Sequence, residues 1–278
     1  MKDGPKEKIR LTDAEELVLP MAFLKATDAS SPKPILGDTY SQDLLNRCDI
    51  DFGRSHFDPD QRNVEWIVGR AKRIDEWCQD FLEAHKAEPV TVLHIACGLD
   101  CRALRVKRDP SVRWIDVDQP LVVDLRSRLI PNVPGDYTLR TLQITKKGWL
   151  NDVPSDRPTL IIAEGLFMYL QQSEGEQIIR EIASYFGRGE FIFDTVGYLC
   201  VKGTPWAKHL KSSKSRWTWG VDDVKKEILP LHPKLQMKDQ IFWWQIGRHP
   251  PMWGELGTFV MSLHPKFKTN LSLNRLEF

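Results

Sequence analysis

The sequence predicts an α/β protein: a doubly wound, mostly parallel sheet of the Rossmann-like type, with an N-terminal helical segment and a C-terminal substrate lid. Short apolar runs alternate along the chain with amphipathic segments of helical period. The runs are apolar throughout rather than at every second residue, which is typical of parallel strands covered on both faces. The 278 residues suffice for one large domain with a substantial core.

The first part of the chain divides near residue 60. Residues 1–60 are expected to form an irregular N-terminal arm or cap, because prolines and a Gly-Asp pair interrupt any periodicity. Residues 61–278 are expected to form the main domain. It opens with a long amphipathic helix over 61–86 that ends near Pro89.

Five apolar runs are the expected parallel strands: VTVLHIA (90–96), VRWIDV (112–117), YTLRTLQI (137–144), TLIIAE (159–164) and FIFDTV (191–196). Between them, QPLVVDLRSRLI is predicted to be helical as far as Pro131. SEGEQIIREIASYF is predicted to be a helix that starts with a capping box from Ser173 to Glu176.

Beyond residue 200 the pattern loosens. A lid is expected over about 200–222, where basic residues and three tryptophans mix. This segment is either a solvated lid or an electropositive, aromatic-lined mouth for a substrate. GTFVMSL (257–263) and LSLNRLEF (271–278) are expected as late strands, antiparallel at the sheet edge.

Composition argues against several classes of function. The formal net charge is only +1, so no strong field attracts nucleic acid or an anionic membrane. No apolar run approaches the roughly 20 residues that span a bilayer. The charged start MKDGPKEKIR lacks an apolar signal core, which favours a cytoplasmic location. Cys97, Cys101 and His94 make an incomplete ligand set for zinc, so no metal site is predicted.

The stretch ACGLDCR (96–102) follows the first strand, where ligands bind in a doubly wound sheet. Gly98 allows a tight turn, but the other positions of a dinucleotide fingerprint hold Ala96 and Cys101. About twenty residues on, Asp116 or Asp118 is placed to bind ribose hydroxyls. A ribose site without a pyrophosphate loop indicates a nucleoside cofactor lacking phosphates, and S-adenosylmethionine fits that description.

From residue 60 onward, four motifs occur in order: HIACGLDCRALR, VRWIDVDQPLVVDLRSRLIP, LQITKKGWLNDVP and RPTLIIAEGLFMYL. Together they resemble the leucine carboxyl methyltransferase family, and more closely its tetracenomycin-type polyketide O-methyltransferase branch. The resemblance implies S-adenosylmethionine as the cofactor. It also implies an O-methyltransferase that acts on a carboxylate or an acidic or phenolic hydroxyl of a small, aromatic or anionic, polyketide-type molecule.

The resemblance assigns cofactor-binding positions residue by residue. By this resemblance, Arg70 binds the cofactor carboxylate, and the methionine part lies among Ala96, Gly98, Asp100 and Arg102. Asp118 binds the ribose, Gln143 and Ile144 contact the adenine, and Glu164 lies beneath the reaction centre. Glu164 and Tyr169 are the expected catalytic residues, Tyr169 facing the substrate. As alternatives, Arg70 would be a solvated helix face and Glu164 a helix cap.

Two departures from the family pattern leave other functions open. Ala96 stands in place of the usual first glycine, and Lys146 stands where relatives often carry Asp. The alternatives are a non-methylating cyclase or isomerase on the same fold, and a protein C-terminal carboxyl methyltransferase. If the reaction uses a general base, His56, His209 and Tyr169 are the candidates; His94, inside an apolar strand, is expected to be a core residue. The sequence predicts no particular oligomeric state.

Overall fold

The computed structural model describes residues 6–9, 18–49, 61–130, 132–204, 216–246, 263–264 and 269–278. Its main feature is a seven-stranded sheet with the order β5-β4-β3-β6-β7-β9-β8. The strands are β3 (Thr91–Ile95), β4 (Arg113–Asp118), β5 (Tyr137–Thr141), β6 (Thr159–Ala163), β7 (Gly189–Val196), β8 (Gln236–Phe242) and β9 (Leu271–Glu277). The first five are parallel, and β9 pairs antiparallel with both β7 and β8. The predicted fold class is therefore confirmed.

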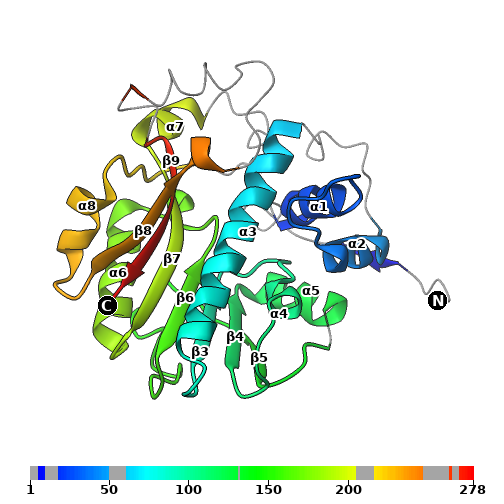
Figure 1. The fold of residues 1–278 in the computed structure, drawn as a ribbon, viewed down its shortest axis with the longest axis horizontal. Helices are drawn as coiled ribbons and strands as arrows, with labels where there is room; N and C mark the ends of the chain where they lie inside the picture. Colours follow the sequence, from blue (N-terminus) through cyan, green and yellow to red (C-terminus); the bar gives the residue numbers. More distant parts are fainter. Residues whose placement is uncertain are drawn as a thin grey trace.

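Helices flank the sheet, and α3 crosses in front of it with α1 and α2 beside it (Figure 1). The described α-helices are α1 (Val18–Ala29), α2 (Thr39–Asn46), α3 (Gln61–Ala84), α4 (Arg102–Arg105), α5 (Pro120–Leu129), α6 (Gln172–Tyr185), α7 (Tyr198–Gly203) and α8 (Val224–Glu227). A short parallel pair, β1 (Glu7–Lys8) with β2 (Cys48–Asp49), lies outside the main sheet. None of the helices in the described ranges is long and apolar enough to cross a membrane.

Two hydrophobic cores form because successive strand residues face opposite sides of the sheet. On one side, Leu93, Ile161 and Phe191 pack with α6 and Trp219. On the other side, the alternate residues of the same strands pack with α3. Both faces are thus covered, which explains why the central strands read as continuous apolar runs.

The N-terminal part differs from the sequence expectation. Residues 18–29 and 39–46 are helical rather than irregular. Pro20 lies in the first turn of α1, where its missing N–H group costs no helical hydrogen bond. Apolar residues of α1 and α2 form a further core with Leu99 and Cys101 of the loop after β3. The predicted domain boundary near residue 60 stays a prediction.

Three smaller expectations also change. The start of α6 is capped two residues earlier than expected: Glu174 accepts a hydrogen bond from the Gln171 N–H group at 2.9 Å, so the predicted Ser173–Glu176 capping box is wrong. LSLNRLEF forms antiparallel β9, but the edge strand is β8, which the sequence did not indicate. The expected strand at 257–263 falls outside the described residues except for its last position, and 205–215 of the expected lid also falls outside them.

Gly175 tests the packing of α6 on the sheet. A Cβ atom at this position would lie 1.9 Å from Cζ3 of Trp219, a ring that is itself buried. Alanine favours a helix interior over glycine by about 1 kcal/mol. Overpacking of this kind costs typically about 1–3 kcal/mol, occasionally more. We therefore expect Gly175→Ala to lower the free energy of unfolding, measured by denaturant titration.

Gly187→Ala is the matched control, because no heavy atom lies within 4 Å of its would-be Cβ. It should change the free energy of unfolding by less than about 0.5 kcal/mol. A stabilised Gly175→Ala variant would contradict the described contact between α6 and Trp219.

Candidate functional site

The candidate site lies at the carboxyl ends of β3 and β6, where the chain order of the sheet reverses. From β3 the chain moves outward to β4 and β5, and it then returns to the other side of β3 as β6. Such a switch point is the usual ligand site of an open α/β sheet. The loops after β3, β4 and β6 carry most of the residues predicted from the sequence.

The loop after β3 is built on two residues with positive φ. Gly98 has φ +53°, and Ala96 has φ +51°, a conformation that L-residues rarely adopt. A Cβ on Gly98 would lie 3.3 Å from Cγ1 of Val18, so α1 packs closely on this turn. Ala96 therefore has a backbone conformation that is typical of glycine.

The structure separates the two candidate ribose carboxylates. Asp118, at the end of β4, accepts the Gly98 N–H group on Oδ2 and the Gln119 N–H group on Oδ1, both at 2.7 Å. Burial raises the pKa of Asp118. Asp116 is fully buried and bound by Trp114 and Arg126, so its carboxylate is already occupied. Asp118 is the carboxylate that adjoins the loop.

Arg70 projects from α3 into the site and is almost fully buried. Its Nε donates to Glu164 Oε1 at 3.0 Å, and its Nη1 donates to Asp194 Oδ2 at 2.7 Å. Asp194 also accepts the Gly165 N–H group at 2.7 Å. The side chain is thus held by two carboxylates rather than lying on a solvated helix face.

Glu164 joins the two parts of the site. Its second oxygen, Oε2, accepts from Nη2 of Arg102 at 2.6 Å. Although burial favours the neutral acid, the charges of Lys25, Arg70 and Arg102 hold the pKa of Glu164 well below its usual range. The carboxylate stays ionised and orients two arginines, so it does not act simply as a helix cap.

The side chains of Asp100 and Arg102, at the end of the loop, take part in a buried network of ion pairs. Asp100 binds Lys25 of α1 at 2.5 Å and Arg105 at 2.9 Å. Arg102 binds Asp75 of α3 at 2.6 Å. These contacts tie α1, α3 and the loop together, and they place both predicted side chains among protein partners.

Tyr169 lies in a short 3₁₀ helix, η3 (Phe167–Tyr169), after β6. Burial raises the pKa of its hydroxyl, which interacts with the side chain of Trp217. Thr218 crosses η3 and donates its N–H group to Met168 O at 2.8 Å. The described end of the expected lid is therefore docked next to Tyr169.

The remaining predicted residues lie farther from these contacts. Gln143 is exposed and Ile144 is half-buried just after β5, at the same edge of the sheet. No hydrogen bond joins either side chain to the others among the described residues. Lys146 is exposed in the same turn. His56 and His209 lie outside the described residues.

His94 and the loop cysteines are core residues. His94 is 1% exposed on β3, between Asp116 and Arg102. Cys97 and Cys101 are buried, and burial raises the pKa of both thiols, that of Cys101 to about 12. These thiols remain protonated at neutral pH, as small packed side chains do.

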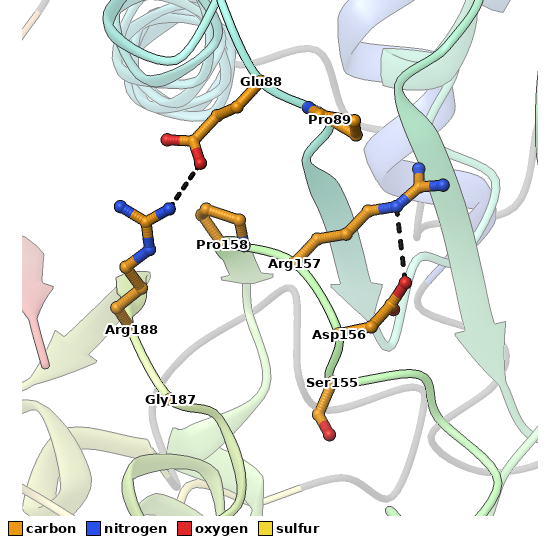
Figure 2. Close-up of a pocket in the computed structure, with 8 residues that line it drawn as sticks. All are labelled: Glu88, Pro89, Ser155, Asp156, Arg157, Pro158, Gly187 and Arg188. Carbon is orange, nitrogen blue, oxygen red and sulfur yellow. Dashed lines mark hydrogen bonds and ion pairs between the residues drawn. The ribbon is translucent and has the colours of Figure 1, made fainter.

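An open hollow of about 450 Å³ occurs at the opposite end of the sheet. Figure 2 shows it between the segments that precede β3, β6 and β7, with Glu88 facing Arg188 and Asp156 facing Arg157. Its lining contains two ion pairs together with Pro89, Ser155, Pro158 and Gly187, at the amino ends of the strands. None of the predicted site residues contributes to it.

Sequence reasoning missed Asp194, Lys25 and Arg126. Asp194 had a signal, since it is the one acid in the apolar run FIFDTV. Lys25 gives no such signal, because it lies in the N-terminal part of the chain, which the sequence predicts to be irregular. The role of Arg126 depends on contacts with residues 26 and 28 positions away in the chain.

The model of the family described as "Leucine carboxyl methyltransferase" matches residues 19–183, more than half of the chain. The tetracenomycin polyketide synthesis O-methyltransferase TcmP of Streptomyces glaucescens is 37% identical over 234 residues, 84% of each chain. The S-adenosyl-L-methionine-dependent methyltransferase dpfgK of Gibberella zeae is 35% identical over 256 residues, 85% of each chain.

Solved structures show the same fold at low sequence identity. Magnesium protoporphyrin IX methyltransferase from Synechocystis PCC 6803, with bound SAH, has a TM-score of 0.50 and 10% identity, covering 87% of this chain and 94% of that one. A Thermobifida fusca YX structure described as a methyltransferase has a TM-score of 0.54 and 16% identity, covering 89% of this chain and 98% of that one.

The positive φ of Ala96 makes a testable prediction about stability. The left-handed conformation costs a non-glycine residue roughly 1–2 kcal/mol, whereas glycine gives back about 0.4–1 kcal/mol through the freedom of the unfolded chain. We expect Ala96→Gly to leave the free energy of unfolding unchanged or to raise it by up to about 1 kcal/mol. Ala71→Gly, inside α3, is the control and should lower it by about 1 kcal/mol. Equal losses in the two variants would refute the strained conformation.

Proposed function

We propose, from the premise that this chain belongs to the leucine carboxyl methyltransferase family and is an S-adenosylmethionine-dependent methyltransferase, that it methylates an oxygen atom of a small polyketide-type molecule. The acceptor is a carboxylate or an acidic or phenolic hydroxyl. When bound, the cofactor supplies an electrophilic methyl group carried on a sulfonium sulfur. The observation that carries this proposal is the buried charge network around Glu164.

The network matches the charge of the cofactor. It contains four cationic and five anionic side chains, which leaves one formal negative charge: Lys25, Arg70, Arg102 and Arg105 against Asp38, Asp75, Asp100, Glu164 and Asp194. S-adenosylmethionine, with its sulfonium, ammonium and carboxylate, carries one net positive charge. Opposite charges attract strongly in a buried site, because water screens them poorly. The donor set therefore fits the cofactor.

Arg70 supports the assignment to the cofactor carboxylate. A guanidinium has five N–H donors, and the contacts with Glu164 and Asp194 leave at least two of them for a ligand. A Cβ at Gly165 would lie 3.7 Å from Nη2 of Arg70, so a side chain there would cover the guanidinium. Glycine at 165 keeps this side of the arginine open.

Asp118 supports the assignment to the ribose. Each of its oxygens accepts one backbone N–H group, and a carboxylate has about four lone-pair sites. The remaining sites can accept hydrogen bonds from two adjacent ribose hydroxyls. Gln143 and Ile144, beyond the end of neighbouring β5, are the proposed adenine contacts.

The protonation states of Tyr169 and Glu164 favour an acceptor that ionises by itself. Burial keeps Tyr169 protonated at neutral pH, so it donates a hydrogen bond to an anionic oxygen rather than removing a proton. Glu164 is a weak base, because its cationic neighbours stabilise the carboxylate. A carboxylic acid is already ionised at neutral pH and needs no base. The name of the Streptomyces relative supports a polyketide acceptor.

Ala96 gives no support to a non-methylating function. It adopts a positive φ of +51°, a conformation that glycine adopts freely, so the turn does not require a glycine at this position. Glu164 and Asp118 keep positions suited to an intact cofactor site. A cyclase and a protein carboxyl methyltransferase are therefore outcomes of the test rather than proposals.

The test measures where the methyl group goes. We expect purified enzyme, given isotope-labelled S-adenosylmethionine and a panel of aromatic polyketide acids and phenols, to label a product and to release one S-adenosylhomocysteine per methyl. Mild alkali removes the label from an ester but not from an aryl ether, which identifies the acceptor. A product of unchanged mass, formed equally well with S-adenosylhomocysteine, would overturn the proposal in favour of a cyclase. In a parallel assay with peptides as acceptors, label on peptide C-termini and on none of the small molecules would overturn it in favour of the protein methyltransferase.

Arg70→Lys tests the carboxylate contact. Lysine keeps the charge but cannot supply a bidentate fork. We expect cofactor affinity, measured by calorimetry, to fall at least tenfold, or about 1.4 kcal/mol. Arg73→Lys, an exposed change on the same helix, is the control and should leave affinity unchanged. Equal affinities in all three proteins would remove Arg70 from the cofactor site.

A further inference from the structure

Arg126 of α5 occupies a buried position directly beneath the loop after β3. It is fully buried, and α5 packs beside β4 and β5 (Figure 1). Its Nη1 donates to two loop carbonyls, Gly98 O at 3.0 Å and Asp100 O at 2.7 Å. Its Nη2 donates to the carboxylate of Asp116 on β4. One side chain thus connects the loop to the sheet.

Asp116, which anchors Arg126 to β4, is itself bound by two other side chains. Asp116 accepts from Trp114 Nε1 at 2.8 Å and from the Tyr137 hydroxyl at 2.9 Å. That hydroxyl also accepts from Arg126 Nε at 3.4 Å. The guanidinium therefore cannot shift without breaking several buried hydrogen bonds, each of which is expensive to leave unmade.

The loop contacts orient specific peptide groups. In a trans peptide unit the C=O and the following N–H point in opposite directions. With its carbonyl held toward Arg126, Gly98 directs the Leu99 N–H group away from the core. This N–H group has no hydrogen-bond partner among the described residues, although Leu99 is 2% exposed. The Gly98 N–H group, on the other side of the same residue, meets Asp118 at 2.7 Å.

We propose that Arg126 is a positioning residue of the cofactor site: by holding the Gly98 and Asp100 carbonyls to Asp116, it fixes the loop so that Asp118 and the Leu99 N–H group are aligned for the cofactor. The inference rests on the proposed function. It requires a guanidinium, because the carbonyls, the carboxylate and the hydroxyl lie in diverging directions that one ammonium group cannot reach together.

The experiment compares two buried arginines, each paired with a buried carboxylate. Arg126→Lys keeps the charge but loses the fork. Arg275→Lys is the control: Arg275 is 6% exposed on β9, bound to Glu190 and Asp80, and it makes no contact with the loop. S-adenosylhomocysteine affinity is measured by calorimetry and stability by thermal unfolding. We expect the dissociation constant to rise at least tenfold in Arg126→Lys and to stay within twofold of wild type in Arg275→Lys, while both variants lose stability.

A double variant covers the case in which Arg126→Lys fails to fold. Arg126→Gln with Asp116→Asn removes both buried charges together, so no unpaired charge remains in the core. The same rise in the dissociation constant is expected. In the methylation assay, KM for S-adenosylmethionine should rise while kcat is retained, since the loop binds the cofactor before and during the reaction.

An unchanged dissociation constant in a folded Arg126 variant would overturn the proposal and leave Arg126 as a structural residue. So would equal losses of affinity in the Arg126 and Arg275 variants, or a wild-type protein that does not bind S-adenosylhomocysteine. Failure of the proposed function looks different. In that case wild type binds S-adenosylhomocysteine and the Arg126 variants bind it more weakly, but no methyl group is transferred.

Discussion

The sharing of the Glu164 carboxylate between Arg70 and Arg102 is the interaction on which the site depends. It joins α3, β6 and the loop after β3 at one buried point. A buried charge is tolerated only where opposite charges and hydrogen bonds compensate its lost hydration. Each partner of Glu164 therefore needs a further carboxylate, and the chain supplies Asp194 and Asp75. The network extends until it reaches Lys25 on α1, which ties this N-terminal helix to the loop after β3.

The fold was predictable where local periodicity reflects burial. The runs TLIIAE and FIFDTV lie in the centre of the sheet, and every residue of β6 is buried. β8 was missed because it is an edge strand with exposed Gln236, Lys238 and Asp239, so no apolar pattern marks it. Residues 18–29 were missed for the opposite reason: Lys25 and Asp28 are buried polar residues, and they obscure the apolar face of α1.

Only the site residues that lie in recognisable motifs could be predicted from the sequence. Arg70, Asp118 and Glu164 follow from the family resemblance, and the structure gives each of them partners. Their functions remain expectations. The partners themselves come from distant parts of the chain, such as Asp194, 124 positions after Arg70. No spacing rule in a single sequence links such residues, because their proximity results from strand order and helix packing.

Ala96 shows how strongly these contacts constrain the loop. A non-glycine residue persists at φ +51° only where its surroundings overdetermine the backbone. The Cys97 N–H group is bound to Val117 O at 3.2 Å, Arg126 holds the next carbonyls from below, and Val18 covers Gly98. These contacts come from β4, α5 and α1, so relaxing the turn would disturb three elements at once. The strain of Ala96 is smaller than the cost of those rearrangements, and for this reason the turn keeps its left-handed conformation.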